Sequence, residues 1–380
     1  MPLLLASLLL AASASTPVVA PENLSPAMGA PPVYAIVGPS STAVRDGDGF
    51  LLAFSAEDAK WPRARTFVTR LDTFGKMTGN LTAIPVTNDG ADAVLPSIVA
   101  APDGWYVGQM EQTTSAPGTG VVWRVNPNLP LPATPFATLS GQLFLRGDDG
   151  KFFASSFSTI FEYTLDGALV ATHPSNNADD VVVIGGEPLP VAHYALPYTP
   201  CFLPPCGTQP PGPSYLIIVG LYEPSATTEV FHFVSNHGVG AATDGATLLT
   251  AFYSGDPRTG GDVKFIRFDD DGHALGDSRT LGTFPGDPLQ QPLRPAVAYD
   301  GTRYLVVWQT GHAIAAASID ADGNVTSIPL PHLGDDAQPN VVAAGRGKFL
   351  ISYGAVRNGE WHLATRLVYF DLGRRPVARR

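Results

Sequence analysis

Charged residues are scarce in this sequence, and the scarcity limits its partners. Only 15% of the 380 residues are charged, against about a quarter in a typical globular protein. Asp and Glu outnumber Lys and Arg by 34 to 23, which gives a net charge of −11, and no Lys/Arg cluster with interleaved aromatic residues is present. Because an acidic surface repels phosphate backbones, we expect no nucleic-acid partner.

Long hydrophobic runs and helical periodicity are also missing. Beyond the first fifteen residues, no apolar stretch is long enough to cross a bilayer, so we expect no membrane span. The 39 Gly and 36 Pro residues favour many turns over long helices, while an apolar content of 44% suffices for a core. This composition favours an all-β protein rich in turns.

The sequence motifs of common catalytic and metal centres are absent. There is no G-x-S-x-G or H-E-x-x-H, and the eight histidines are scattered. His193 and His237 could act as acid or base, but each lies in or beside an expected strand, where a core histidine is the simpler interpretation. We expect no catalytic residue and no bound transition metal.

Two aspartate-rich segments resemble calcium loops and leave a calcium cofactor open as the weaker alternative. They are FDDDGHALGD (268–277) and IDADGNVT (319–326), in which Asp recurs at alternate positions. Both lack the bidentate glutamate of a calcium loop, and both fall where a hairpin turn is expected. We therefore expect turns without a cofactor.

The N-terminus has the pattern of a signal peptide. An apolar run from Leu3 to Ala12 precedes an A-x-A-like site at Ala12–Ala14. No Lys or Arg precedes the run, and the alternative is an ordinary apolar strand; no cysteine follows it to carry a lipid. We expect a signal peptide over 1–15, a disordered linker over 16–30, and a secreted, periplasmic or cell-envelope protein.

The only two cysteines are Cys201 and Cys206, in a proline-rich insertion over 197–214. Export permits a disulfide, and the C-x4-C spacing closes a small loop. Two sulfurs without a nearby histidine pair do not make a zinc site. We expect a structural disulfide, with a redox role as the alternative.

A repeated hairpin organises the rest of the chain. A turn glycine precedes an apolar strand at Gly49, Gly104, Gly150, Gly245, Gly301 and Gly347, mostly at intervals of 46 to 56 residues. The interval of 95 residues between Gly150 and Gly245 spans about two repeats, so a degenerate copy should lie near 185–222. The chain therefore contains seven copies.

Each copy carries a second hairpin and so provides four strands. After YLVVW (304–308), for example, comes IAAASIDADGNVTSI, and Asp-Gly tolerates the positive φ of tight hairpin turns. In YLVVW both strand faces are apolar, as in a sheet packed between two others. We expect a monomeric β-propeller over 31–375 with seven four-stranded blades, a tail over 376–380, and closure by the N-terminal strand VYAIVG (33–38), which would complete the last blade.

The repeat itself resembles a known group of proteins. The unit P-x-V-A-x-x-G-x-x-[YF]-L-V-x-[WY], followed by an I-D-x-D-G hairpin, stands at 295–308 and 319–323. It is similar to repeats of secreted bacterial, myxobacterial-type β-propeller proteins of unassigned activity, and the resemblance covers most of 30–375. The motif is structural, so it implies a fold and no chemistry. The S-x-D-x-G-x-x-W box of sialidases is absent.

The variable loops should gather on one face. In a four-stranded meander, the first and third turns share one face, where the short Asp-Gly turns lie, so the longer loops occupy the other. We expect the ligand-binding residues there: Glu57, Asp58, Trp61, Asp256, Arg258, Gln309, His312, Arg357 and Trp361, with Glu111 and Glu360 also in these loops.

These residues favour an exported, non-catalytic binding or scaffold module for a glycan or an envelope protein. Tryptophan rings can stack on sugars while carboxylates bind hydroxyls, although the simpler interpretation of each residue is a solvated loop position, with tryptophan packed against its neighbours. The alternative is a polysaccharide hydrolase or lyase with two loop carboxylates about 5 to 10 Å apart. A third hypothesis is a protein-interaction platform with an apolar patch around Trp61 and Trp361.

Overall fold

The computed structural model describes residues 17–28, 41–58, 61–113, 116–126, 129–141, 143–175, 178–195, 214–219, 230–232, 238–256, 259–286 and 294–370. Of residues 57, 58, 61, 62, 116, 117, 193–195, 214–216, 218, 230–232 and 256, only the backbone is described. Every regular element within these ranges is a β-strand. No helix in them has the length and apolar character needed to cross a membrane.

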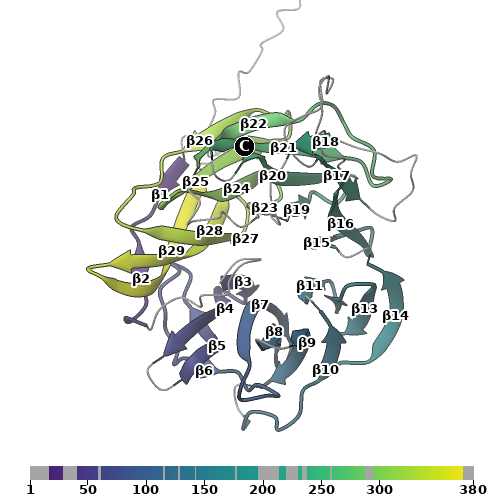
Figure 1. The fold of residues 1–380 in the computed structure, drawn as a ribbon, viewed down its shortest axis with the longest axis vertical. Coiled ribbons are helices and arrows are strands. Elements are labelled where there is room, and N and C mark those ends of the chain that lie inside the picture. Colours follow the sequence, from purple (N-terminus) through teal and green to yellow (C-terminus); the bar gives the residue numbers. More distant parts are fainter. Residues whose placement is uncertain are drawn as a thin grey trace, which may run out of the picture.

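The strands of the described residues form antiparallel sheets arranged around a common centre (Figure 1). Six sheets have four strands each, and the four strands of each sheet are consecutive in the sequence. The first three sheets are β3 (Ser41–Asp46), β4 (Gly49–Asp58), β5 (Trp61–Leu71) and β6 (Thr82–Ala83); β7 (Asp92–Ala101), β8 (Gly104–Thr113), β9 (Ala116–Val125) and β10 (Ala137–Ser140); and β11 (Phe144–Asp148), β12 (Lys151–Ser155), β13 (Thr159–Thr164) and β14 (Leu169–Pro174). The next three are β15 (Asp180–Ile184), β16 (Glu187–Ala195), β17 (Ser214–Val219) and β18 (Val230–His232); β19 (Gly240–Thr243), β20 (Leu248–Asp256), β21 (Gly260–Phe268) and β22 (Arg279–Pro285); and β23 (Ala296–Tyr299), β24 (Arg303–Thr310), β25 (Ala313–Asp320) and β26 (Val325–Ile328). The last sheet contains β27 (Asp336–Ala343), β28 (Lys348–Arg357) and β29 (Glu360–Phe370), with β1 (Pro17–Val19) and β2 (Asn23–Leu24) both paired to β29.

Short turns join the first two strands of each sheet, as the repeat predicts. At the β23–β24 turn, Gly301 has a φ of 92°, a conformation that glycine adopts without strain. The Asp300 carboxylate accepts hydrogen bonds from the amides of Thr302 (2.8 Å) and Arg303 (2.9 Å), which closes the turn locally. The degenerate copy expected near 185–222 is the sheet β15–β18, so the all-β class and the four-stranded units are confirmed.

The middle strands are buried on both faces, which explains their continuous apolar runs. In β24, Tyr304, Val306 and Trp308 pack into the cluster shared with β19–β22, while Leu305 and Val307 pack into the cluster shared with β27–β29. Each such side chain contributes about 1.5–3 kcal/mol by leaving water. The core of the molecule therefore lies between neighbouring sheets.

The first strand of each sheet faces the centre. In order around it, β3 contacts β7, β7 contacts β11, β11 contacts β15, β15 contacts β19, β19 contacts β23, and β23 contacts β27. The strand β27 in turn contacts β3. The beginnings of these strands share one face of the molecule with the loops between second and third strands, because each meander reverses direction at every turn.

The N-terminal segment lies against the last sheet. Residues expected in a disordered linker over 16–30 instead form β1 and β2, and the amide of Ala20 donates to the Leu367 carbonyl at 2.8 Å. The outer edge of β29 offers unpaired backbone groups, which attract a further strand. The predicted closing strand at 33–38 lies outside the described residues, as do Cys201, Cys206, His237 and the insertion at 197–213.

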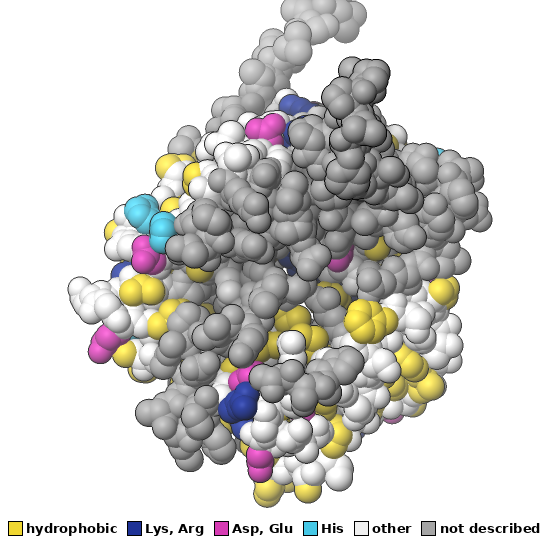
Figure 2. Space-filling model, in the orientation of Figure 1, with side chains coloured by type: hydrophobic (Ala, Val, Ile, Leu, Met, Phe, Trp, Pro, Cys, Tyr) yellow, Lys and Arg dark blue, Asp and Glu magenta, His cyan; other side chains and the backbone are white. Residues whose placement is uncertain are grey.

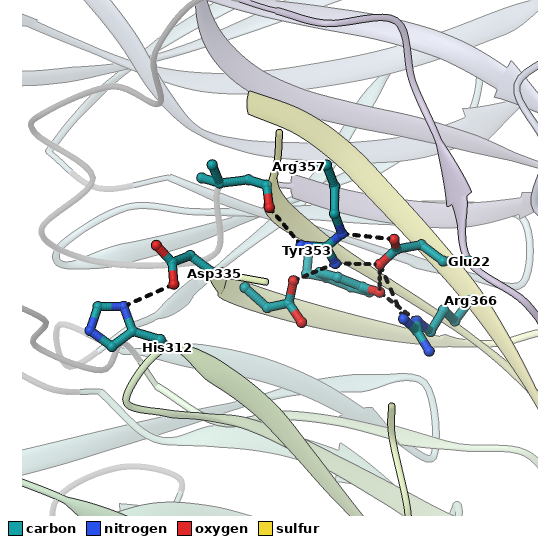
Figure 3. A network of polar contacts seen from close by, with 8 residues as sticks. Glu22, His312, Asp335, Tyr353, Arg357 and Arg366 are labelled. Carbon is teal, nitrogen blue, oxygen red and sulfur yellow. Dashed lines mark hydrogen bonds and ion pairs between the residues drawn. The ribbon is translucent and has the colours of Figure 1, made fainter. Parts of the chain in front are cut away.

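A buried polar network fixes this N-terminal segment (Figure 3). The Glu22 carboxylate accepts hydrogen bonds from Arg357 Nη2 (2.6 Å), Arg357 Nε (3.0 Å), Arg366 Nη2 (3.2 Å) and the Tyr353 hydroxyl (2.5 Å). Arg357 also pairs with Asp336 at 2.7 Å. Two carboxylates and two guanidinium groups therefore balance one another where β1 and β2 meet β28 and β29.

Candidate functional site

Five of the predicted ligand-binding residues lie where the structure describes little or nothing. Glu57 and Asp58 are at the end of β4, Trp61 begins β5 and Asp256 ends β20, all described as backbone alone. Arg258 lies outside the described residues. Their strand ends do lie at the turns between second and third strands, which is the face expected from the repeat.

Three further predicted residues meet around the segment that leads into β27. The Gln309 side-chain oxygen accepts a hydrogen bond from the Gln338 amide at 3.1 Å, and Arg357 pairs with Asp336. His312 is exposed, with its Nδ1 3.4 Å from an oxygen of Asp335 (Figure 3). Gln309 thus joins β24 to β27 of the next sheet, whereas Arg357 joins strands of the last sheet to the N-terminal segment. His312 is the most exposed of the three.

The expectation that Trp361 is an exposed stacking ring is wrong. The side chain is only 7% exposed and packs in the hydrophobic cluster of Phe54 and Leu363, with the backbone of Gly354 directly beneath its indole. Glu111, from the wider set of loop residues, is also buried and accepts hydrogen bonds from the Thr87 amide. Glu360 is exposed on β29. The expectation for Trp361 is wrong because the ring is buried between neighbouring sheets, and no local sequence pattern reveals that burial.

The structure points instead to the centre of the molecule. The first strands surround a cavity of about 420 Å³, a volume within the usual range of small-molecule sites. Its walls combine apolar residues such as Val181 and Val341 with polar residues such as Thr42, Ser97 and Asn340. On the face drawn in Figure 2, the described acidic and basic side chains are scattered, in places next to one another, and form no large patch of one sign.

Three charged side chains from three parts of the chain meet in the wall of this cavity. We call Arg146, Asp180 and Arg294 the Asp180 cluster. Arg146 Nη2 donates to Asp180 Oδ1 at 2.5 Å, and Arg294 Nη1 lies 3.2 Å from Asp180 Oδ2. The amides of Val181 (2.9 Å) and Ala241 (3.2 Å) donate to the same carboxylate. Asp180 therefore has donors on both oxygens.

The folding of the first strands brings the Asp180 cluster together. Arg146 is the third residue of β11, Asp180 begins β15, and Arg294 stands just before β23. Gly240 of β19 leaves room for the backbone of Pro295, the residue after Arg294, and the Arg294 guanidinium lies 4.8 Å from the centre of the Phe144 ring. Because strands begin at the loop face, the cluster lies at that end of the cavity.

The charges of the Asp180 cluster are fixed at neutral pH. Burial alone raises the pKa of the Asp180 carboxyl, but the adjacent Arg146 and Arg294 outweigh burial and hold this pKa below its usual range. The carboxyl stays ionised and cannot serve as a proton donor. The cluster therefore carries two positive charges against one negative charge.

The sequence offered only a weak signal for these residues. Arg146 interrupts the first strand of a repeat in a chain with few basic residues, and Arg294 directly precedes the repeat unit that starts at Pro295. Both positions can be noticed, but Asp180 lies 34 residues from Arg146 and 114 from Arg294. Only the arrangement of the sheets shows that the three belong together.

Comparisons with known proteins place this chain near others by fold alone. No family model and no curated protein matches it. Among solved structures, it is similar to the β-propeller domain of the trilobed protease from Pyrococcus furiosus (8% identity, TM-score 0.46, covering 92% of this chain and 94% of that one). It is also similar to Aleuria aurantia lectin in complex with α-methyl-L-fucoside (11%, 0.44, 89% and 96%) and to the GH43_1 enzyme from Xanthomonas citri complexed with xylotriose (13%, 0.38, 89% and 89%). At these TM-scores, no functional property of this chain follows.

Proposed function

We propose that the protein is a seven-bladed β-propeller whose central cavity binds a small ligand. The unbroken order of contacts among the first strands, from β3 through β27 and back to β3, supports seven blades around one axis. The pairing of β1 and β2 with β29 supports closure by the N-terminal segment. A cavity on this axis, at the meeting of all the blades, is where propellers offer a ligand the most contacts.

The ligand class that we propose is a glycan. The observation that carries the proposal is the cavity itself: about 420 Å³, walled by both apolar and polar residues, with the guanidinium of Arg146 and the carboxylate of Asp180 at one end. Sugars present both apolar CH faces and hydroxyl groups, and this wall offers partners to each. An envelope protein as ligand would need an apolar surface outside the cavity.

We favour binding over catalysis because of how Asp180 is held. Its carboxylate accepts four donors and stays ionised, whereas a glycosidase acid must carry a proton at working pH. A polysaccharide hydrolase or lyase remains the alternative proposal. It would need two carboxylates from the loop face, for which Asp58 and Asp256 are the candidates.

We further propose an exported, monomeric protein located in the periplasm, at the cell envelope or outside the cell. The apolar run from Leu3 to Ala12 and the repeat unit at 295–308 support this proposal. Fractionation of cells that express the full chain, with N-terminal sequencing of the exported product, tests it. A product that begins near residue 16 is expected, and an uncleaved intracellular chain would contradict export.

A thermal-shift screen tests glycan binding. The full chain is mixed with neutral and acidic oligosaccharides, with calcium and with a chelator, since a ligand of the native state raises Tm by mass action. We expect at least one glycan to raise Tm in the native protein and not in Thr42→Phe, which narrows the cavity. Thr172→Phe, on the exposed strand β14, is the matched control and should keep the shift. No glycan-dependent shift would refute the proposal.

A further inference from the structure

We propose that Arg146 recognises the carboxylate of an acidic ligand in the central cavity, and that a uronate-containing oligosaccharide is the ligand class. The proposal rests on the proposed function, because it names the kind of glycan that the cavity selects. Its basis is the geometry of one guanidinium group, the balance of charge around it and the volume beside it.

The protein uses one side of the Arg146 guanidinium and leaves the other side open. Nε donates to the Val181 carbonyl at 3.0 Å and Nη2 donates to Asp180 at 2.5 Å. Of its five N–H bonds, both on Nη1 and one on Nη2 have no partner among the described residues. The side chain is 40% exposed although Asp180, which orients it, is 4% exposed. The open edge is the one that binds a planar carboxylate through two parallel hydrogen bonds.

The positive charge of Arg294 neutralises Asp180 and so leaves the charge of Arg146 available to a ligand. Arg294 pairs with Asp180, donates to the Asp179 carbonyl and lies over the Phe144 ring, with its side chain only 14% exposed. Arg294 thus neutralises the buried carboxylate, and the positive charge of Arg146 stays unbalanced. A buried carboxylate that both orients an arginine and is itself neutralised elsewhere is a preorganised anion site.

Two other carboxylates lie nearby and oppose an anion less strongly. Asp148 also lines the cavity, but it is two residues beyond Arg146 on β11, about 7 Å along the strand, and it is exposed at the hairpin turn, where water and salt screen its charge. Asp179 is not among the residues that line the cavity, and its Oδ2 lies 3.4 Å from the Val239 amide. The cavity end therefore keeps a local positive charge within an acidic protein.

The cavity favours a carboxylate on a sugar over a phosphate. A single open guanidinium edge matches one planar carboxylate, whereas a phosphate has at least three acceptor oxygens to satisfy. The remaining wall combines apolar side chains such as Val181 and Val341 with polar ones such as Thr42 and Asn340, which suits the CH face and the hydroxyl groups of a pyranose ring. A uronic acid combines both features in one ring.

Calorimetric titration of the full chain tests the proposal. The probes are trigalacturonate, its fully methyl-esterified form, which lacks the charges but keeps the rings, and inorganic phosphate. The proteins are the wild type, Arg146→Gln, Arg146→Lys and the control Arg45→Gln, an exposed arginine at the opposite face. Because a charged hydrogen bond exceeds a neutral one, we expect the wild type to bind the acid roughly 10- to 100-fold more tightly than the ester.

The variants decide whether Arg146 is responsible. Arg146→Gln should bind acid and ester within about 2-fold of each other, Arg146→Lys should keep part of the preference, and Arg45→Gln should keep all of it. A cooperative melting transition near the wild-type Tm verifies that each variant is folded. Equal binding of acid and ester by the wild type, or tighter binding of phosphate, overturns this inference and leaves the proposed function standing. Failure of both oligosaccharides to bind overturns this inference and counts against the proposed function.

Discussion

Replacement of Glu22 by Gln should destabilise the whole molecule, although residue 22 lies in the short N-terminal segment between β1 and β2. Glu22 is 6% exposed and connects the N-terminal segment to Arg357 and Arg366, whose side chains are 11% and 2% exposed. Gln keeps the size of the side chain but removes its charge. The variant would leave Arg357 with Asp336 as its remaining carboxylate and the buried Arg366 with none among the described residues.

The size of the loss in unfolding free energy follows from the charge imbalance that the substitution leaves in the buried network. Removal of one partner from a buried ion pair costs about 3–5 kcal/mol, because the other charge stays buried. Asp336 still pairs with Arg357 at 2.7 Å, so the lower end, about 3 kcal/mol, applies. Glu360→Gln, an exposed position on β29 in register with Arg357, is the matched control and should change stability by less than about 0.5 kcal/mol.

The pH dependence of the stability difference between wild type and Glu22→Gln provides an independent test, because the direction of the pKa shift fixes its sign. Burial alone raises the pKa of Glu22, but its hydrogen bonds from Arg357, Tyr353 and Arg366 outweigh burial and lower it below the usual value. A lowered pKa of an acid stabilises the folded state above the unfolded-state pKa, about 4.3 for Glu, and the contribution is lost as pH falls through the folded-state pKa. The difference between wild type and Glu22→Gln should therefore be full at pH 6 to 7 and shrink below about pH 4.

Urea unfolding followed by tryptophan fluorescence and circular dichroism measures these differences. If Glu22→Gln and Glu360→Gln unfold at the same urea concentration at pH 7, the network does not anchor the N-terminal segment, and the reasoning fails. A difference that grows as the pH is lowered from 6 to 3 would show that the sign of the pKa shift is wrong.

Three further substitutions test the packing and the Asp180 cluster. Gly240→Ala places a Cβ 2.0 Å from the Pro295 carbonyl oxygen, so we expect the free energy of unfolding to fall by about 1–3 kcal/mol. Ligand binding should also weaken, because a shift of Pro295 moves the adjacent Arg294. An unchanged Tm and unchanged binding would contradict this prediction. Trp361→Ala should lower the free energy of unfolding by about 3–5 kcal/mol, whereas Phe74→Ala, at a side chain 67% exposed, should change it by less than about 0.5 kcal/mol; similar values by urea unfolding would argue against burial of Trp361. Asp180→Asn should cost about 3–5 kcal/mol at pH 7, and because the pKa of Asp180 is lowered, the cost should diminish as the pH falls below about 4; a cost independent of pH would refute the charged state of Asp180.

Most of the secondary structure could be predicted because its causes are local. Asp300 and Gly301 close their turn with hydrogen bonds between near neighbours, and the alternation in 304–308 reports burial on both faces of one strand. The candidate site could be predicted far less well. Trp361 was expected on the loop face and is buried, because a tryptophan near a turn has the same local sequence whether it packs inward or outward.

Local sequence patterns were enough to predict an all-β protein made of repeated four-stranded antiparallel sheets, since strand alternation and Asp-Gly turn chemistry act over a few residues. The three-dimensional arrangement of the sheets was needed to show that Glu22 lies beside Arg366, 344 residues away, and that Arg146, Asp180 and Arg294 share one cavity. These contacts join different sheets, and their geometry depends on how every sheet packs against the next. A charge that lies between sheets carries no periodic signal along the chain, so its partner becomes visible only when the sheets are assembled.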